Sequence, residues 1–163
     1  MKHLFFLILA FQLTLTTSLK AQNTEEAAIK AVIEKETNSF FQRDFAAWES
    51  TFVQADYAFQ AWNNRKDFDA SVSYNSIAAR IGNYIKKHPT PTVARVVRKN
   101  FIFKFYDNST VFVTFDQYNG NKKGQARLSK EIRLMEKQDG QWKIAMLAAF
   151  WDYKQIFKLA DLE

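Results

Sequence analysis

The residues best suited to chemistry lie in the stretch VFVTFDQY, residues 111–118. On a β-strand its side chains divide between two faces, Phe112, Thr114, Asp116 and Tyr118 on one and Val111, Val113, Phe115 and Gln117 on the other. If the first face lines a cavity, Asp116 can act as a general base or accept hydrogen bonds from a ligand, with Tyr118 as donor. Alternatively, Asp116 is the solvated end of a strand and bonds to backbone or to a lysine. The sequence leaves both interpretations open.

A second pair of candidate ligand-binding residues, Glu131 and Arg133, shares a strand face two positions apart. A desolvated guanidinium beside a carboxylate can hold an anionic ligand. The alternative is a cross-strand salt bridge on the outer face of a sheet or at a dimer interface, where ion pairs contribute little to stability. The turn at Asp139-Gly140 can be two-residue or bulged, and that choice changes which neighbours the pair meets.

Tyr57 and Trp62 complete the candidate ligand site, because aromatic side chains near a pocket mouth can stack on a flat ligand. They fit equally well as lid residues of the core. No residue is assigned a catalytic role, no cofactor is expected, and no metal is expected, since the chain has no cysteine and only 2 histidines. A Gly-x-Ser-x-Gly motif and a phosphate-binding loop are both absent from the sequence.

Helices are expected in the first half of the domain. Apolar residues recur at helical spacing over residues 24–42, Asp44 is a good cap for a second, shorter helix, and residues 73–87 form a third that ends before Pro89. The stretch ADYAFQAWNNRKDFDASVS, residues 55–73, predicts a short strand followed by a loop.

From Thr92 onward, four long β-type runs follow one another, separated by turn signals. Hairpin-linked strands of this kind make an antiparallel sheet, and strands this long twist strongly. The predicted fold is therefore α+β, with three N-terminal helices packed in the concavity of a strongly curved antiparallel sheet. The C-terminal stretch from Asp152 is expected to form a short amphipathic helix.

The first 21 residues predict a secretory signal peptide, with a basic start at Lys2, an apolar run and a small residue at Ala21. Residues 22–163 then form a single exported domain, periplasmic or secreted, with no membrane span in the mature chain. The formal charge of +6 falls to +4 when Lys2 and Lys20 leave with the leader. So mild a charge argues against a nucleic-acid partner.

The hairpin EIRLMEKQDGQWKIAML, residues 131–147, resembles the last two strands of the nuclear transport factor two-like, or SnoaL-like, superfamily. VTFDQ, residues 113–117, is similar to the preceding strand of its exported bacterial members, and RDFAAWESTF, residues 43–52, resembles their second helix. The resemblance implies a cone-shaped fold that hosts isomerases, dehydratases, cyclases, transport factors and domains with no known activity. Many relatives carry a histidine near the end of the last strand, where this chain has Ala148 and Ala149, a departure that argues against an enzyme.

Three functions follow from these expectations. The first is binding of a small, apolar or aromatic molecule in the cone cavity. The second is an isomerase or dehydratase that uses Asp116 as acid or base. The third is a homodimeric interaction module without a ligand, since sheets of the superfamily often pair through their outer faces and Leu147, Ala149 and Trp151 can supply an apolar patch. Binding is preferred, with a homodimer through the outer sheet face.

Overall fold

The computed structural model describes the backbone of residues 2–162 and the side chains of residues 22–162. The predicted leader, residues 1–21, lies outside the residues with described side chains and stays a prediction. Where side chains are described, no helix has the length and hydropathy needed to cross a bilayer.

Three helices form as predicted, and the third has nearly its expected bounds, but the first begins well before residue 24, where it was predicted to start, although it ends at Gln42 as expected. They are α1 (Lys2–Gln42), α2 (Phe45–Glu49) and α3 (Tyr74–Lys87). Asp44 caps α2 by accepting a hydrogen bond from the Ala47 amide at 2.9 Å, and Ser73 caps α3 by accepting one from the Ser76 amide at 3.3 Å. Two lysines in the last turn of α3 complement the helix dipole.

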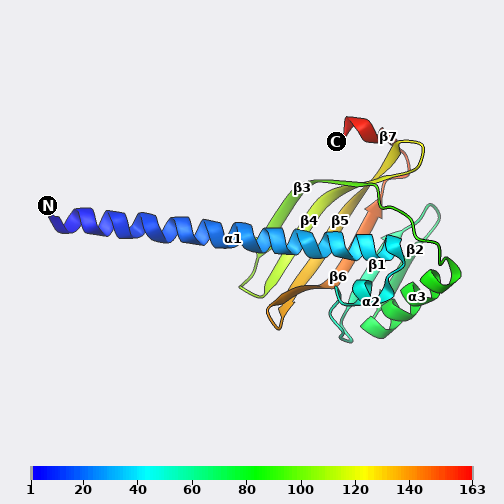
Figure 1. Ribbon diagram of the computed structural model, residues 1–163, viewed down its shortest axis with the longest axis horizontal. Coiled ribbons are helices and arrows are strands. Elements are labelled where there is room, and N and C mark those ends of the chain that lie inside the picture. Colours follow the sequence, from blue (N-terminus) through cyan, green and yellow to red (C-terminus); the bar gives the residue numbers. More distant parts are fainter. Residues whose placement is uncertain (1, 163) are drawn as a thin grey trace.

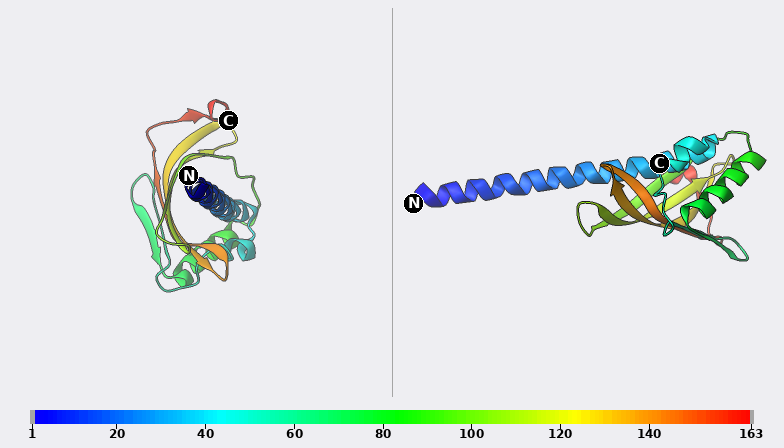
Figure 2. Two further views of the ribbon diagram at one scale, coloured as in Figure 1. Left: turned by 90° about the vertical axis from the view of Figure 1, so that its left-hand side faces the viewer. Right: turned by 90° about the horizontal axis from the view of Figure 1, so that it is seen from below.

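The described strands form one curved, open sheet in the order β2-β1-β6-β5-β4-β3, with β7 paired to β5. Their bounds are β1 Phe59–Asn63, β2 Phe68–Val72, β3 Val96–Phe105, β4 Thr110–Gly120, β5 Gln125–Gln138, β6 Gln141–Trp151 and β7 Phe157–Lys158. Only the β1–β6 pair is parallel among them. The α+β architecture predicted from the sequence is confirmed, since α1 runs through the concave side of the sheet (Figures 1 and 2).

Two expectations about short segments were wrong. The second half of the expected loop after β1 forms β2, which pairs with β1 from Phe59 opposite Val72 to Asn63 opposite Phe68. The expected C-terminal helix is instead β7 followed by a 3-10 turn at Leu159–Asp161. Pairing with β5 and burial of Leu159 outweigh the helical pattern of a segment too short to hold a helix alone.

Two β-bulges set which side chains face the interior. In β3, Lys99 lies opposite Asp116 and Ile102 opposite Thr114, so Asn100 is the extra residue, with φ 56°. In β6, Met135 lies opposite Ile144 and Leu134 opposite Met146, so the extra residue is Ala145. Each bulge shifts the inward and outward alternation of its strand by one residue.

The core fills one end of the concave side. α1 contributes Ile29 and Ile33, α2 contributes Trp48, and the strands contribute a fully buried set that includes Val111, Val113, Met135 and Ile144. Phe101 and Phe115 stack with ring centroids 4.8 Å apart above this set. Because these rings occupy only one end, the other end of the concave side can remain hollow.

The turn between β5 and β6 is a two-residue turn, with Gln138 paired to Gln141. Asp139 and Gly140 have φ 51° and 76°, as a type I′ turn requires. We expect Gly140→Ala to lower the free energy of unfolding by about 1–2 kcal/mol, because a Cβ at this φ crowds the following carbonyl. Urea unfolding checks this value.

The matched control is Gly82→Ala in the interior of α3, where a Cβ would lie 3.5 Å from the Phe45 ring in ordinary contact. This change should raise stability by about 0.5–1 kcal/mol, because alanine has the higher helix propensity. If both substitutions changed the free energy of unfolding equally, the positive φ of Gly140 could not be the cause of its effect.

Candidate functional site

The hollow end of the cone is a cavity of about 270 Å³ between α1, α3 and the inner face of the sheet. Its apolar wall comprises Phe40, Phe41, Trp62, Ile81, Leu147, Ala149 and Trp151. Its polar wall comprises Glu36, Thr37, Gln60, Gln117, Asn119, Glu131 and Arg133. The volume lies just below the usual range for small-molecule sites, roughly 300–1,000 Å³, so the cavity suits a small ligand. Aromatic side chains beside a few buried polar groups are typical of such sites.

Glu131 and Arg133 form the charged centre of the polar wall. Both are only 2% exposed, and Nη1 of Arg133 lies 2.9 Å from Oε2 of Glu131. The hydroxyl of Ser129 donates a hydrogen bond to the other carboxylate oxygen of Glu131. The Arg133 guanidinium also lies 5.4 Å from the centroid of the Phe115 ring. The pair is therefore the desolvated arrangement rather than a salt bridge on the outer face.

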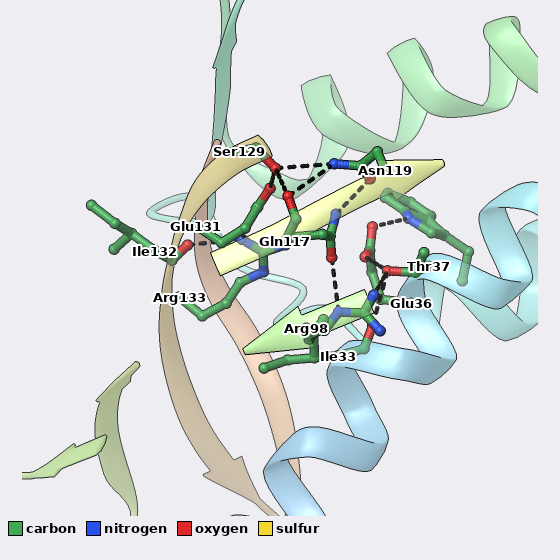
Figure 3. A network of polar contacts seen from close by, with 11 residues as sticks. Ile33, Glu36, Thr37, Arg98, Gln117, Asn119, Ser129, Glu131, Ile132 and Arg133 are labelled. Carbon is green, nitrogen blue, oxygen red and sulfur yellow. Dashed lines mark hydrogen bonds and ion pairs between the residues drawn. The ribbon is translucent and has the colours of Figure 1, made fainter. Parts of the chain in front are cut away.

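A chain of hydrogen bonds connects this pair to α1 (Figure 3). Ser129 accepts from Asn119 at 3.1 Å, and Asn119 accepts from Gln117 at 3.0 Å. Arg98 donates from Nε to Gln117 at 2.8 Å and from Nη2 to Thr37 at 2.6 Å. Because the polar side chains are tied to one another, their positions around the cavity are fixed before any ligand arrives.

Glu36 is a buried carboxyl of the site that the sequence-based prediction missed. Its Oε1 accepts from the Trp48 indole at 3.3 Å and its Oε2 from the Thr37 hydroxyl at 3.2 Å. Burial raises the pKa of Glu36, and although the charge of Arg133 and the Trp48 hydrogen bond act in the opposite direction, the pKa stays above 4.5. Its position could have been found, because it lies on the same helical stripe as Ile29, Ile33 and Phe40.

The raised pKa makes stability depend on pH. The folded protein keeps the Glu36 proton to a higher pH than the unfolded chain does. The contribution of this group to the free energy of unfolding is therefore fully present below the unfolded pKa and is lost as pH rises through the folded pKa. We therefore expect the stability of the wild type, relative to Glu36→Gln, to fall as the pH rises above the ordinary glutamate pKa. Urea unfolding at several pH values measures this difference.

Glu34→Gln is the matched control, because Glu34 lies on the same helix but is exposed. It should keep the pH dependence of the wild type. A Glu36→Gln variant with the same pH dependence as the wild type would contradict the raised pKa.

Of the six predicted ligand-binding residues, the structure brings Trp62, Glu131 and Arg133 together in the cavity wall. Trp62 packs under the Arg80 guanidinium, which lies 4.0 Å from its ring centroid and donates to Gln60 at 2.9 Å. Tyr57 does not join them. It is 58% exposed, and its hydroxyl donates to Glu136 at 2.6 Å.

Of the two interpretations left open for Asp116, the one in which its side of β4 lines the cavity is wrong. Val111, Val113 and Phe115 pack in the core, and Gln117 continues their face into the cavity. Asp116 points to the outer face, where it accepts hydrogen bonds from the exposed Lys130 and from Asn100. The more apolar of the two strand faces packs against the helices. Burying its apolar side chains stabilises the fold, whereas burying the Asp116 carboxylate against the helices would cost free energy.

Asp116 instead holds the β3 bulge in place through the 2.8 Å hydrogen bond from Asn100. Burial alone would raise the pKa of Asp116, but the hydrogen bonds from Lys130 and Asn100 hold it below its usual range. Tyr118 is also outside the cavity wall, with its ring 5.2 Å from that of Phe157 on β7. Neither residue is placed to act on a molecule in the cavity.

The residues predicted to form an outer apolar patch, Leu147, Ala149 and Trp151, line the cavity instead. Simple alternation from Ile144, which is buried in the core, would turn them outward. The bulge at Ala145 reverses that alternation. No group of three potential metal ligands occurs among the described residues.

Comparison with solved structures shows that the chain has the nuclear transport factor two-like fold. An NTF-2 like protein of unknown function from Shewanella oneidensis aligns with TM-score 0.59 and 16% identity over 77% of this chain and 98% of its own. A putative scytalone dehydratase from Novosphingobium aromaticivorans aligns with TM-score 0.63 and 10% identity over 86% and 91% of the two chains.

A ketosteroid isomerase-like protein from Erwinia carotovora atroseptica aligns with TM-score 0.54 and 19% identity over 77% and 94% of the two chains. No family model matches the sequence. No curated protein matches it either. At these identities the similarity establishes the fold, and a function must be argued from the cavity itself.

Proposed function

We propose that this protein is an exported domain that binds a small, partly apolar molecule in the cavity beneath α1. The observation that carries the proposal is the combination of an aromatic wall with the buried Glu131–Arg133 pair in one cavity of about 270 Å³. A buried ion pair costs desolvation energy that an apolar pair would avoid, so its presence in a hollow space favours a role in recognition. The signal-peptide pattern of residues 1–21 supports export.

Untargeted extraction of the protein purified from the envelope of its own cell tests this proposal. We expect mass spectrometry to recover one discrete small molecule from the wild type. Ala149→Phe should lose it, because the ring would fill the cavity that Ala149 lines. Ala70→Phe, an exposed position on β2, is the matched control and should retain it. Circular dichroism confirms that both variants fold. Empty wild-type protein, or identical extracts from both variants, would overturn the proposal.

A second candidate function is a proton-transfer enzyme of the isomerase or dehydratase type, and Glu36 is the observation that favours it. A buried carboxyl with a raised pKa at a cavity wall can serve as a general acid or base. Glu36 would replace Asp116 in this role. Incubating the extracted molecule with the wild type should then give a product, and Glu36→Gln should bind the molecule without converting it. Unchanged turnover by Glu36→Gln would exclude this role.

We also propose that two copies pair through the outer sheet face. Within the part of the backbone that the structure describes, no helix covers this face (Figure 2). Ile102 and Phe150 are 67% and 56% exposed. Between them the outward alternation of β4, β5 and β6 continues the apolar surface through Phe112, Ile132, Leu134 and Met146. These apolar residues share the face with Thr114 and with the Asp116–Lys130 ion pair at its edge. An exposed, mainly apolar sheet face suits a two-fold interface, in which each copy presents the same patch.

Native mass spectrometry at micromolar concentration tests the pairing. The wild type should be a dimer, and Ile132→Glu should be a monomer, because it places a charge at the centre of the outer face. Val93→Glu is the control, since Val93 is exposed away from the sheet. A monomeric wild type would remove the dimer without affecting the cavity.

A further inference from the structure

The charges around the cavity do not balance. Arg133 and Glu131 compensate each other as an ion pair. The nearby Arg98 has no ion pair among the described residues, because its two hydrogen bonds go to the neutral side chains of Gln117 and Thr37. The remaining carboxyl is Glu36, whose hydrogen bonds go to Trp48 and Thr37. Whenever Glu36 carries its proton, these four residues together have one positive charge in excess, and it belongs to Arg98, which lies behind the polar wall in contact with Gln117 and Thr37.

The Arg133 guanidinium is also incompletely bonded. Both of its hydrogen bonds, to Glu131 and to the Ile132 carbonyl, are made by Nη1 at 2.9 Å. Its Nε is buried without a partner. Buried donors are nearly always satisfied, and an arginine with spare N–H groups is suited to a further acceptor. The guanidinium therefore has donor capacity that the protein itself does not use.

The opposite wall adds no negative charge to offset this. Phe40, Phe41 and Trp151 are apolar, and Trp62 carries the Arg80 guanidinium on its ring. Gln60, the polar residue beside Trp62, accepts its hydrogen bond from the same arginine. Arg80 lies behind Trp62 and interacts with the charge of Asp69, so the excess positive charge comes from the side of Arg98 and Arg133. The aromatic rings of the opposite wall match a flat apolar body.

From this arrangement we infer that the cavity ligand is a small organic monoanion, a carboxylate carried on an apolar body about the size of one aromatic ring. The inference rests on the proposed binding function and specifies its ligand class. A carboxylate is planar and matches a guanidinium with paired hydrogen bonds. A single negative charge neutralises the single excess positive charge, and the cavity volume of about 270 Å³ leaves room for little more than one ring.

Ligand binding is then linked to the Glu36 proton. Two positive groups, Arg133 and Arg98, and one negative group, Glu131, act on Glu36, with Trp48 and Thr37 in direct hydrogen-bond contact. A carboxylate placed among them adds a second negative charge near Glu36, which favours its protonated form. Binding should therefore take up a proton, and affinity should fall as pH rises through the Glu36 pKa.

Titration of the full-length mature domain with three probes of one shape tests the inference. Benzoate, benzyl alcohol and benzylamine differ in charge but share the ring, and fluorescence of the cavity tryptophans reports their binding. Benzoate should bind at least about tenfold more tightly than benzyl alcohol, and benzylamine should bind most weakly. Calorimetry in two buffers of different ionisation enthalpy should show proton uptake with benzoate alone.

Arg98→Met removes the excess charge and leaves the Glu131–Arg133 pair intact. It should weaken benzoate binding by about tenfold and change benzyl alcohol binding by no more than about twofold. Arg95→Met is the matched control, because Arg95 is exposed. Thermal unfolding by circular dichroism establishes whether both variants are folded. If Arg98→Met does not fold, the comparison of the three probes on the wild type still tests the inference.

The outcomes separate the two proposals. If benzyl alcohol binds as tightly as benzoate, the anion inference is overturned while the cavity remains a binding site. If none of the probes binds, the anion inference is again overturned, and the extraction experiment decides independently whether the cavity holds a molecule at all.

Discussion

Replacing Arg133 with methionine is expected to lower the free energy of unfolding by about 3–5 kcal/mol. The reason is the carboxylate left behind. Glu131 is 2% exposed and would keep only the Ser129 hydroxyl as a donor after the guanidinium is removed. Removing one partner of a buried pair exposes the full desolvation cost of the other. Urea unfolding at neutral pH measures the change.

The matched control is the double variant Glu131→Leu/Arg133→Met, which removes both charges and fills the same space with apolar groups. Its stability should be close to that of the wild type or above it. With the single variant Glu131→Leu measured as well, the double-mutant cycle gives the coupling energy of the pair. A cost below about 1 kcal/mol for Arg133→Met alone would mean that cavity water hydrates Glu131, and the desolvated description of the site would be wrong.

Trp48→Ala is expected to cost about 3–5 kcal/mol, the range for deleting a large aromatic side chain from a core. Trp48 is fully buried, and its ring lies 4.7 Å from that of Phe52 and 5.7 Å from that of Phe45. The indole also donates to Glu36, so the substitution removes one of the two hydrogen bonds that hold this carboxyl. The change should therefore reduce ligand binding as well as stability.

Phe68→Ala is the control for size, because Phe68 is 69% exposed on β2 and its truncation should change stability by no more than about 0.5 kcal/mol. Trp48→Phe separates packing from hydrogen bonding, since it keeps a ring in the core but cannot donate to Glu36. A loss of ligand binding in Trp48→Ala but not in Trp48→Phe would assign the effect to packing alone.

The fold was predictable because its signals are local and repeated. Helical spacing, the Asp44 cap and the Asp139-Gly140 turn each specify one element, and the long β-type runs leave an antiparallel sheet as the way to bury them. The strand β2 was missed because its alternation, FDASV, spans only five residues, and the strand is almost entirely exposed in the structure, so no buried face specifies it. β2 forms because the edge strand β1 offers free backbone groups for hydrogen bonding, and not because of a strong strand signal in its own sequence.

The site was only partly predictable. Glu131 and Arg133 were recognised by their types and spacing, but the face of β4 that lines the cavity was left open, so Asp116 and Tyr118 remained candidates. Alternation divides a strand into two sets without stating which set packs against the helix, and β4 carries polar groups on both. Glu36 was overlooked because only the apolar residues of the helical stripe were used to predict the helix. A carboxyl within such a stripe is informative, because charged residues are rarely buried.

The two bulges have a consequence for how the length of this chain can vary. Asn100 and Ala145 are extra residues opposite a shorter partner strand. Losing either one straightens the ladder but leaves every later side chain on its present side, whereas a deletion elsewhere in the same strands inverts all that follow. Homologues should therefore tolerate one-residue gaps at these two sites and almost nowhere else in β3 and β6. An alignment that places its gaps there will keep the cavity residues in matching columns, even where little sequence identity remains to guide it.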